Sequence, residues 1–235
     1  MTTTYSRRAI LQQIGLAGFA AATGTAGSIE HAFAQADSRP WYFLTATEAR
    51  WLAAACDVLI PEDDFPSASQ AGVVDYIDLQ LATDYGNGHG LYLQGPFPKG
   101  TPEQGYQLPL TPAELIRQGI EDHIKSGPAL FDLAPEARQS SIQALSENDG
   151  DLGTVPASTF FNELLSLTNE GYFADPIYLG NANYAGWKMV GFPGAHAYYL
   201  ERVDAFNRPY VKPPMGIAHD SSGRSTLPRI IPQES

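Results

Sequence analysis

The chain has 235 residues, enough for one domain with a hydrophobic core. Its formal net charge is −12 and it contains no run of basic residues, which argues against nucleic acid or an anionic membrane surface as its partner. The 18 prolines and 22 glycines, together with 43% apolar residues, predict a folded protein with many turns.

Residues 1–34 have the layout of an export signal. The pair Arg7 and Arg8, followed by a modestly apolar stretch, resembles the twin-arginine motif of proteins that are exported already folded. Small residues before the site predict cleavage between Ala34 and Gln35. A membrane anchor is the alternative, but the stretch is only weakly apolar for a spanning helix. We therefore expect a periplasmic protein.

Six segments of the mature chain repeat apolar residues at helical spacing, and no strand-rich block is present. Two of these segments begin with a capping residue and a glutamate three positions later, Thr45 with Glu48 and Thr111 with Glu114. The pattern predicts a mainly α fold, in which residues 35–207 form a single irregular helical domain. The helices are expected at 45–60, 71–83, 111–125, 135–145, 158–171 and 196–206.

Two long loops rich in glycine and proline interrupt this helical pattern, at residues 84–110 and 172–195. Ser158 or Thr159 is expected to cap the helix before the second loop, and Gly171 to end it. Loops of such length in a compact domain usually carry function or bind a partner.

The sequence shows little catalytic chemistry. Neither a dinucleotide-binding glycine motif nor a haem-attachment motif occurs, and we expect no catalytic residue, cofactor site or metal site in this chain. Cys56 is the lone cysteine, and its apolar neighbours predict a buried thiol rather than one paired with another chain. His123 lies beside two acidic residues and is expected on a solvated helix face. The acidic run 62–64 lacks the spacing of a calcium loop.

The C-terminal residues 208–235 contain five prolines and keep no periodicity. We expect this extended tail to be either disordered or laid across another protein.

A long motif in the second loop region resembles the gluconate 2-dehydrogenase subunit 3 family. The motif covers residues 171–181 and 185–194, includes Trp187, and has Leu179 where members often have a glycine. The earlier helices and the first loop are similar as well, so the resemblance extends over nearly all of the mature chain. A twin-arginine signal is also common in this family.

The resemblance implies a heterotrimer that oxidises a CH–OH group of a sugar or sugar acid. A large subunit of the glucose-methanol-choline oxidoreductase type would carry FAD, and a multihaem cytochrome c subunit would pass electrons to quinone in the inner membrane. The present chain would be the non-catalytic small subunit without a cofactor of its own. It would bind the flavin subunit and support its folding and twin-arginine export, and it would reach the membrane only through the cytochrome.

The residues of the second loop that would contact a partner are its large, stiff side chains. The alternative is that they pack the core of this chain. The candidates are Tyr172, Phe173, Tyr178, Asn181, Tyr184, Trp187 and Phe192.

Two other functions stay open at the level of sequence. The first is a stand-alone periplasmic enzyme, such as a hydrolase that uses His89 or His196 with a nearby carboxylate. The second is a scaffold for another exported oxidoreductase.

Overall fold

The computed structural model describes residues 40–98, 100–101, 107–195, 203–204, 208 and 212–217. The expected export signal, with Arg7, Arg8, Ala34 and Gln35, lies outside these ranges, as does nearly all of the helix expected at 196–206. Within them the chain is mainly α and has no strand, as predicted. The elements are α3 (Ala46–Leu59), α4 (Val73–Ala82), α5 (Pro112–Ser126), the 3-10 turn η2 (Leu130–Asp132), α6 (Pro135–Glu147), α7 (Ala157–Phe173), η3 (Pro176–Tyr178), η4 (Ala182–Tyr184) and α8 (Ala185–Val190).

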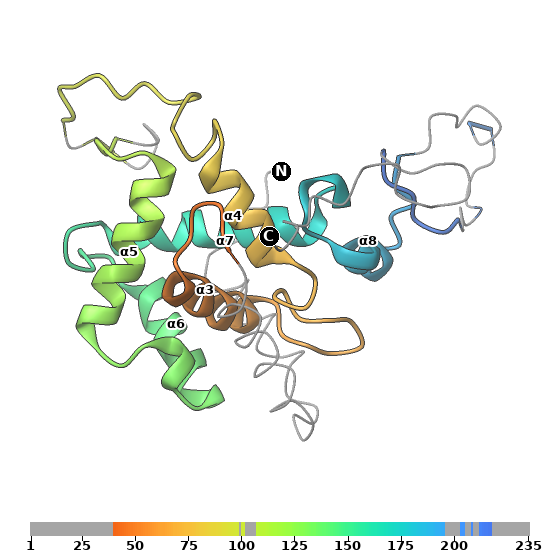
Figure 1. Ribbon diagram of the computed structural model, residues 1–235, viewed down its shortest axis with the longest axis horizontal. Helices are drawn as coiled ribbons and strands as arrows, with labels where there is room; N and C mark the ends of the chain where they lie inside the picture. The colour runs from red at the N-terminus through yellow and green to blue at the C-terminus, as the bar shows by residue number, and fades with distance from the viewer. Residues whose placement is uncertain are drawn as a thin grey trace.

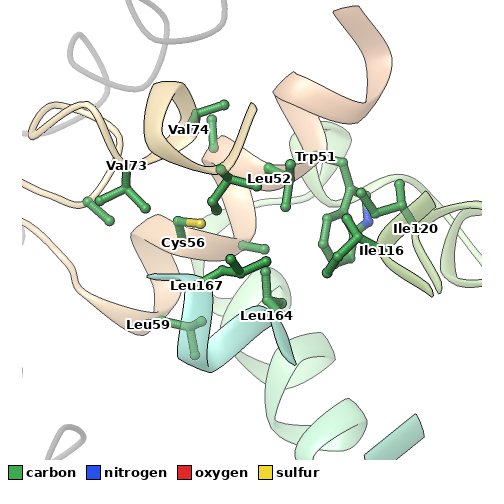
Figure 2. Close-up of a cluster of buried hydrophobic side chains, with 14 of the residues drawn as sticks. Trp51, Leu52, Cys56, Leu59, Val73, Val74, Ile116, Ile120, Leu164 and Leu167 are labelled. Atoms are coloured by element: carbon green, nitrogen blue, oxygen red, sulfur yellow. The ribbon is translucent and has the colours of Figure 1, made fainter. Parts of the chain in front are cut away.

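Helix α7 passes through the middle of the molecule, and α3, α4, α5 and α6 all pack against it (Figure 1). Figure 2 shows the core where these helices meet, with Trp51, Leu52 and Cys56 of α3 close to Leu164 and Leu167 of α7. All five side chains are fully buried, and each large apolar one contributes roughly 1.5–3 kcal/mol. None of the helices in the described part of the chain is long and apolar enough to span a bilayer.

Both predicted capping boxes form. The Thr45 hydroxyl accepts a hydrogen bond from the Glu48 N–H at 3.2 Å, while the Glu48 carboxylate accepts from the Thr45 N–H at 2.7 Å. Thr111 and Glu114 make the same pair of bonds at the start of α5. Each cap stabilises its helix by about 1 kcal/mol. The first and last residues of α3, α4, α5 and α6 all lie within two residues of the expected bounds.

The expected ends of α7 are wrong. The helix begins after Pro156, with no side-chain cap, so Ser158 and Thr159 lie inside it. It also continues through Gly171 to Phe173. Glycine at position 171 allows α4 to approach α7 closely. A Cβ at this position would lie only 3.0 Å from the Tyr76 ring of α4. The glycine therefore serves helix packing rather than helix termination.

His123 is buried, which contradicts the expectation of a solvated helix face. Its Nδ1 accepts a hydrogen bond from the Trp51 indole N–H at 3.3 Å, and its Nε2 lies 3.2 Å from the Ser141 hydroxyl. Burial lowers the pKa of the imidazole. The polar neighbours of His123 in sequence misled the prediction, because its ring points to α3 and α6.

The Cys56 thiol is buried, as predicted, and its sulfur lies 3.3 Å from the Thr168 hydroxyl. Burial raises the pKa of this thiol to about 12, so it carries almost no thiolate at neutral pH. The cysteine is therefore a core residue of the α3–α7 contact.

Asp78 of α4 holds the residues that precede α3. Its buried carboxylate accepts three backbone hydrogen bonds, from Tyr42 at 2.8 Å and from Phe43 and Leu44 at 2.9 Å. Arg117 of α5 adds a hydrogen bond to the Phe43 carbonyl at 2.8 Å and lies 3.9 Å above the Phe43 ring. Together these contacts fix residues 42–44 on the bundle.

Candidate functional site

The second loop region forms a structured lobe beside the helix bundle. We call residues 171–195 and 212–217 the C-terminal lobe, which includes the end of α7, η3, η4 and α8. In Figure 1 α8 and the blue segments near it extend to the right of the bundle. The sequence predicted an irregular loop over 172–195, whereas the structure shows short helical turns and a six-residue helix there.

Trp187 is the centre of this lobe. Its indole N–H donates to the Phe173 carbonyl at 2.7 Å, and the side chain is only 6% exposed. The Tyr184 ring stacks on it, with ring centroids 5.4 Å apart, and the Phe192 ring meets it edge-on at 5.0 Å. Aromatic pairs of this kind are worth about 0.5–1.5 kcal/mol each beyond their area burial.

Asn181 fixes the backbone between α7 and α8. Its buried side chain donates to the Ala174 carbonyl at 2.8 Å and accepts from the Gly186 N–H at 2.9 Å. Asn181 itself has a φ of 51°, and Leu179 and Tyr184 also have positive φ, at 77° and 59°. Such backbone costs of the order of 1–3 kcal/mol per residue and persists only where surrounding contacts hold it.

Residues 212–217 of the tail pack against this lobe. Met215 exchanges backbone hydrogen bonds with residues 193 and 195 at 3.2 and 2.7 Å, and the Gly216 N–H donates to the Tyr184 hydroxyl at 3.0 Å. The Ile217 N–H donates to the Asp175 carboxylate at 2.8 Å. We expected the tail to be disordered or bound to another protein; in its described part, Met215, Gly216 and Ile217 bind to their own chain.

The seven candidate interface residues divide into two groups. Tyr172, Asn181 and Trp187 are buried, and Tyr184 is half-buried, so these four hold the lobe together. The other three are 37–47% exposed and present apolar surface to solvent. Three further exposed apolar residues of the lobe were not singled out from the sequence. The complete exposed set is Phe173, Tyr178, Leu179, Val190, Phe192 and Ile217.

Charge is distributed unevenly between the bundle and the lobe. Residues 41–170 contain 19 acidic and five basic side chains, whereas the C-terminal lobe contains Asp175, Lys188 and Lys212 as its charged residues. Asp175 is occupied by hydrogen bonds from the backbone N–H groups of Ile177 and Ile217. Low charge with several large apolar side chains is typical of the core of a protein–protein interface.

The histidines in the described ranges do not assemble a hydrolytic site. His89 pairs with Asp84 at 3.3 Å, and both side chains are largely exposed. Ser141 and His123 are in contact, but the Trp51 indole can only donate, so Nδ1 of His123 carries the lone pair and Nε2 the proton. In that tautomer His123 cannot take a proton from Ser141. His196 lies outside the described residues.

The other long loop carries a second surface feature. Its described part forms an open hollow of about 330 Å³, lined by residues such as Leu91, Tyr92 and Phe97. Nowhere in the described ranges do three or more side chains of His, Cys, Asp or Glu gather as a metal site would require.

A protein-family model matches more than half of the chain. The family model described as gluconate 2-dehydrogenase subunit 3 matches residues 46–194, a range that runs from α3 through the bundle and nearly to the end of the first stretch of the lobe. Searches of curated proteins and of solved structures gave no match.

Proposed function

Because the chain belongs to the gluconate 2-dehydrogenase subunit 3 family, we propose that it is the small, non-catalytic subunit of an exported, FAD-dependent dehydrogenase complex. The family match carries this proposal, since it covers both the bundle and the aromatic motif of the lobe. Its partners are a large flavin subunit of the glucose-methanol-choline type, which oxidises a sugar or sugar acid, and a multihaem cytochrome c. FAD and haem c belong to these partners.

In this proposal the chain works by binding. It associates with the flavin subunit in the cytoplasm, supports its folding, and brings it to the twin-arginine pathway through Arg7 and Arg8. The complex then acts in the periplasm and is held at the inner membrane by the cytochrome. The exposed apolar side chains of the lobe support a role in protein association.

The direct test is to purify the tagged mature chain from a periplasmic extract of its own host and record an absorbance spectrum. We expect a large second chain together with flavin and c-type haem bands. The matched control is the same chain expressed alone, which should be colourless and show no dehydrogenase activity. Dehydrogenase activity in the chain alone, or a stable colourless monomer from the host extract, would contradict the proposal.

A further inference from the structure

We propose that the C-terminal lobe is the docking surface for the flavin-bearing subunit, an inference that rests on the function proposed above. The occupant is a larger folded protein that offers an apolar surface with carboxylates at its edge. The argument depends on where the apolar side chains lie, on the charge around them and on the rigidity of the backbone beneath them.

Three of the exposed apolar residues, Phe173, Phe192 and Ile217, are tied to the same framework of contacts. Phe173 and Phe192 are joined through Trp187, which binds the Phe173 carbonyl and contacts the Phe192 ring. Ile217 is joined to the stretch between Phe173 and Tyr178 by its hydrogen bond to Asp175. Val190 and Ile217 are the most exposed apolar side chains of the lobe, at 60% and 63%. Several large exposed apolar residues in one small lobe are typical of an interaction site, whereas an isolated one is not.

Charge selects the kind of partner. The bundle has a large excess of acidic groups, so it repels other acidic surfaces. The lobe instead places Lys188 and Lys212, both exposed, beside its apolar residues. A second copy of this chain is a poor occupant, because its lysines would meet these lysines and its acidic bundle would approach this one. A partner with an apolar centre complements the exposed apolar residues, and an acidic edge on that partner complements Lys188.

The lobe also has the rigidity that an interface needs. Asn181 makes two side-chain hydrogen bonds to the backbone, and the positive φ angles around it allow few alternative conformations. Residues 212–217 add hydrogen bonds to Tyr184 and Asp175. A surface that is ordered before binding loses less conformational entropy in the complex, and this favours affinity.

The test compares aspartate substitutions on two surfaces of the full mature chain. Val190→Asp and Ile217→Asp place a charge in the lobe, and Tyr92→Asp is the matched control in the other long loop, where the side chain is 81% exposed. Figure 1 shows that this loop and α8 lie at opposite ends of the molecule. Purified flavin subunit is titrated onto each variant, and thermal unfolding checks that all variants fold like the wild type.

We expect each lobe variant to weaken binding of the flavin subunit by about tenfold or more, and Tyr92→Asp to leave it unchanged. Lys188→Glu should weaken binding mainly at low salt, because the lost attraction is screened at high salt. If both lobe variants bind the flavin subunit as tightly as the wild type does, the proposed docking surface is wrong and the proposed function is unaffected. A lobe-dependent dimer of this chain would overturn it as well. A wild-type chain that does not bind the flavin subunit would contradict the proposed function, and the docking surface with it.

Discussion

At the scale of single residues, His123 shows how a buried polar group constrains its own chemistry. The Trp51 indole N–H donates a hydrogen bond to Nδ1, and the N–H on Nε2 donates one to the Ser141 hydroxyl. Burial disfavours the charged ring and lowers its pKa. Protonation of Nδ1 would also place two N–H groups against each other. At pH 7 the folded protein therefore holds His123 neutral.

This constraint predicts a stability that depends on pH. In the unfolded chain the pKa of His123 is near 6.5, so above that pH both states are neutral and the full stability is present. Below it the unfolded state binds a proton that the folded state resists, so the free energy of unfolding falls by up to about 1.4 kcal/mol per pH unit. His123→Asn, which keeps an acceptor near Trp51, should be less stable at pH 7.5 but should lose less stability on acidification. Urea unfolding at pH 7.5 and 5.5 measures both values.

His89→Asn is the control for this experiment, because His89 is largely exposed and its substitution removes no buried hydrogen bond. The pKa of Asp122 is lowered by hydrogen bonds from Thr154 and Gln118, so the stability that it contributes is lost only as the pH falls below about 4. That range lies outside the window of the measurement. An identical pH dependence in wild type and His123→Asn would show that His123 does not titrate as described.

At the scale of elements, the sequence predicted what local chemistry determines. Thr45 and Thr111 begin their helices because the capping partner lies three residues away, and such a signal is visible in the sequence. The start of α7 has no side-chain cap, and the role of Gly171 depends on Tyr76 of another helix. The contact between Gly171 and Tyr76 joins residues far apart in the chain, so periodicity and spacing did not reveal it.

Gly119 gives a test of such a contact between elements. It lies in the middle of α5, where alanine would ordinarily favour the helix by about 1 kcal/mol. A Cβ at this position would overlap the Phe160 ring of α7, which is fully buried and cannot move freely. We expect Gly119→Ala to lower the free energy of unfolding by about 1–3 kcal/mol, because overpacking outweighs the gain in helix propensity.

Urea denaturation of Gly119→Ala should be compared with that of Gly127→Ala. Gly127 follows α5 with extended backbone, and a Cβ there would meet no atom within 4 Å, so that variant should be within about 0.5 kcal/mol of wild type. If Gly119→Ala were as stable as Gly127→Ala, the α5–α7 contact would have to be looser than the structure shows.

At the scale of the whole molecule, the bundle and the lobe differ in how far the sequence predicted them. Aromatic residues and the family motif located the lobe, but they did not show which side chains point outward. Tyr172 and Tyr178 are both tyrosines of one motif, yet the first is buried with its hydroxyl bonded to Pro66 and the second is 47% exposed. That difference in burial arises from how α7 and η3 pack, and this packing cannot be predicted from composition or residue spacing.

The last prediction concerns residues 212–217 of the tail. Their hydrogen bonds described above join the beginning of the lobe to its end, and none of these bonds reaches the core of the bundle. A chain that ends at Val211 loses the bonds of Met215, Gly216 and Ile217 to the lobe. The helices α3 to α7 keep their apolar core, so we expect cooperative unfolding of the bundle to change by less than about 1 kcal/mol. Amide hydrogen exchange in α8 should become at least tenfold faster, since local opening no longer breaks those bonds.

A chain that ends at Ile217 is the matched control for this truncation, because it keeps all the bonds between the tail and the lobe. Its exchange in α8 should equal that of the full mature chain. Equal protection of α8 in both truncated chains would mean that Trp187 and Asn181 order the lobe without the tail. If the chain that ends at Val211 lost both bundle stability and protection of α8, lobe and bundle would unfold as one cooperative unit. The lobe could then not be treated as a separate element that residues 212–217 stabilise.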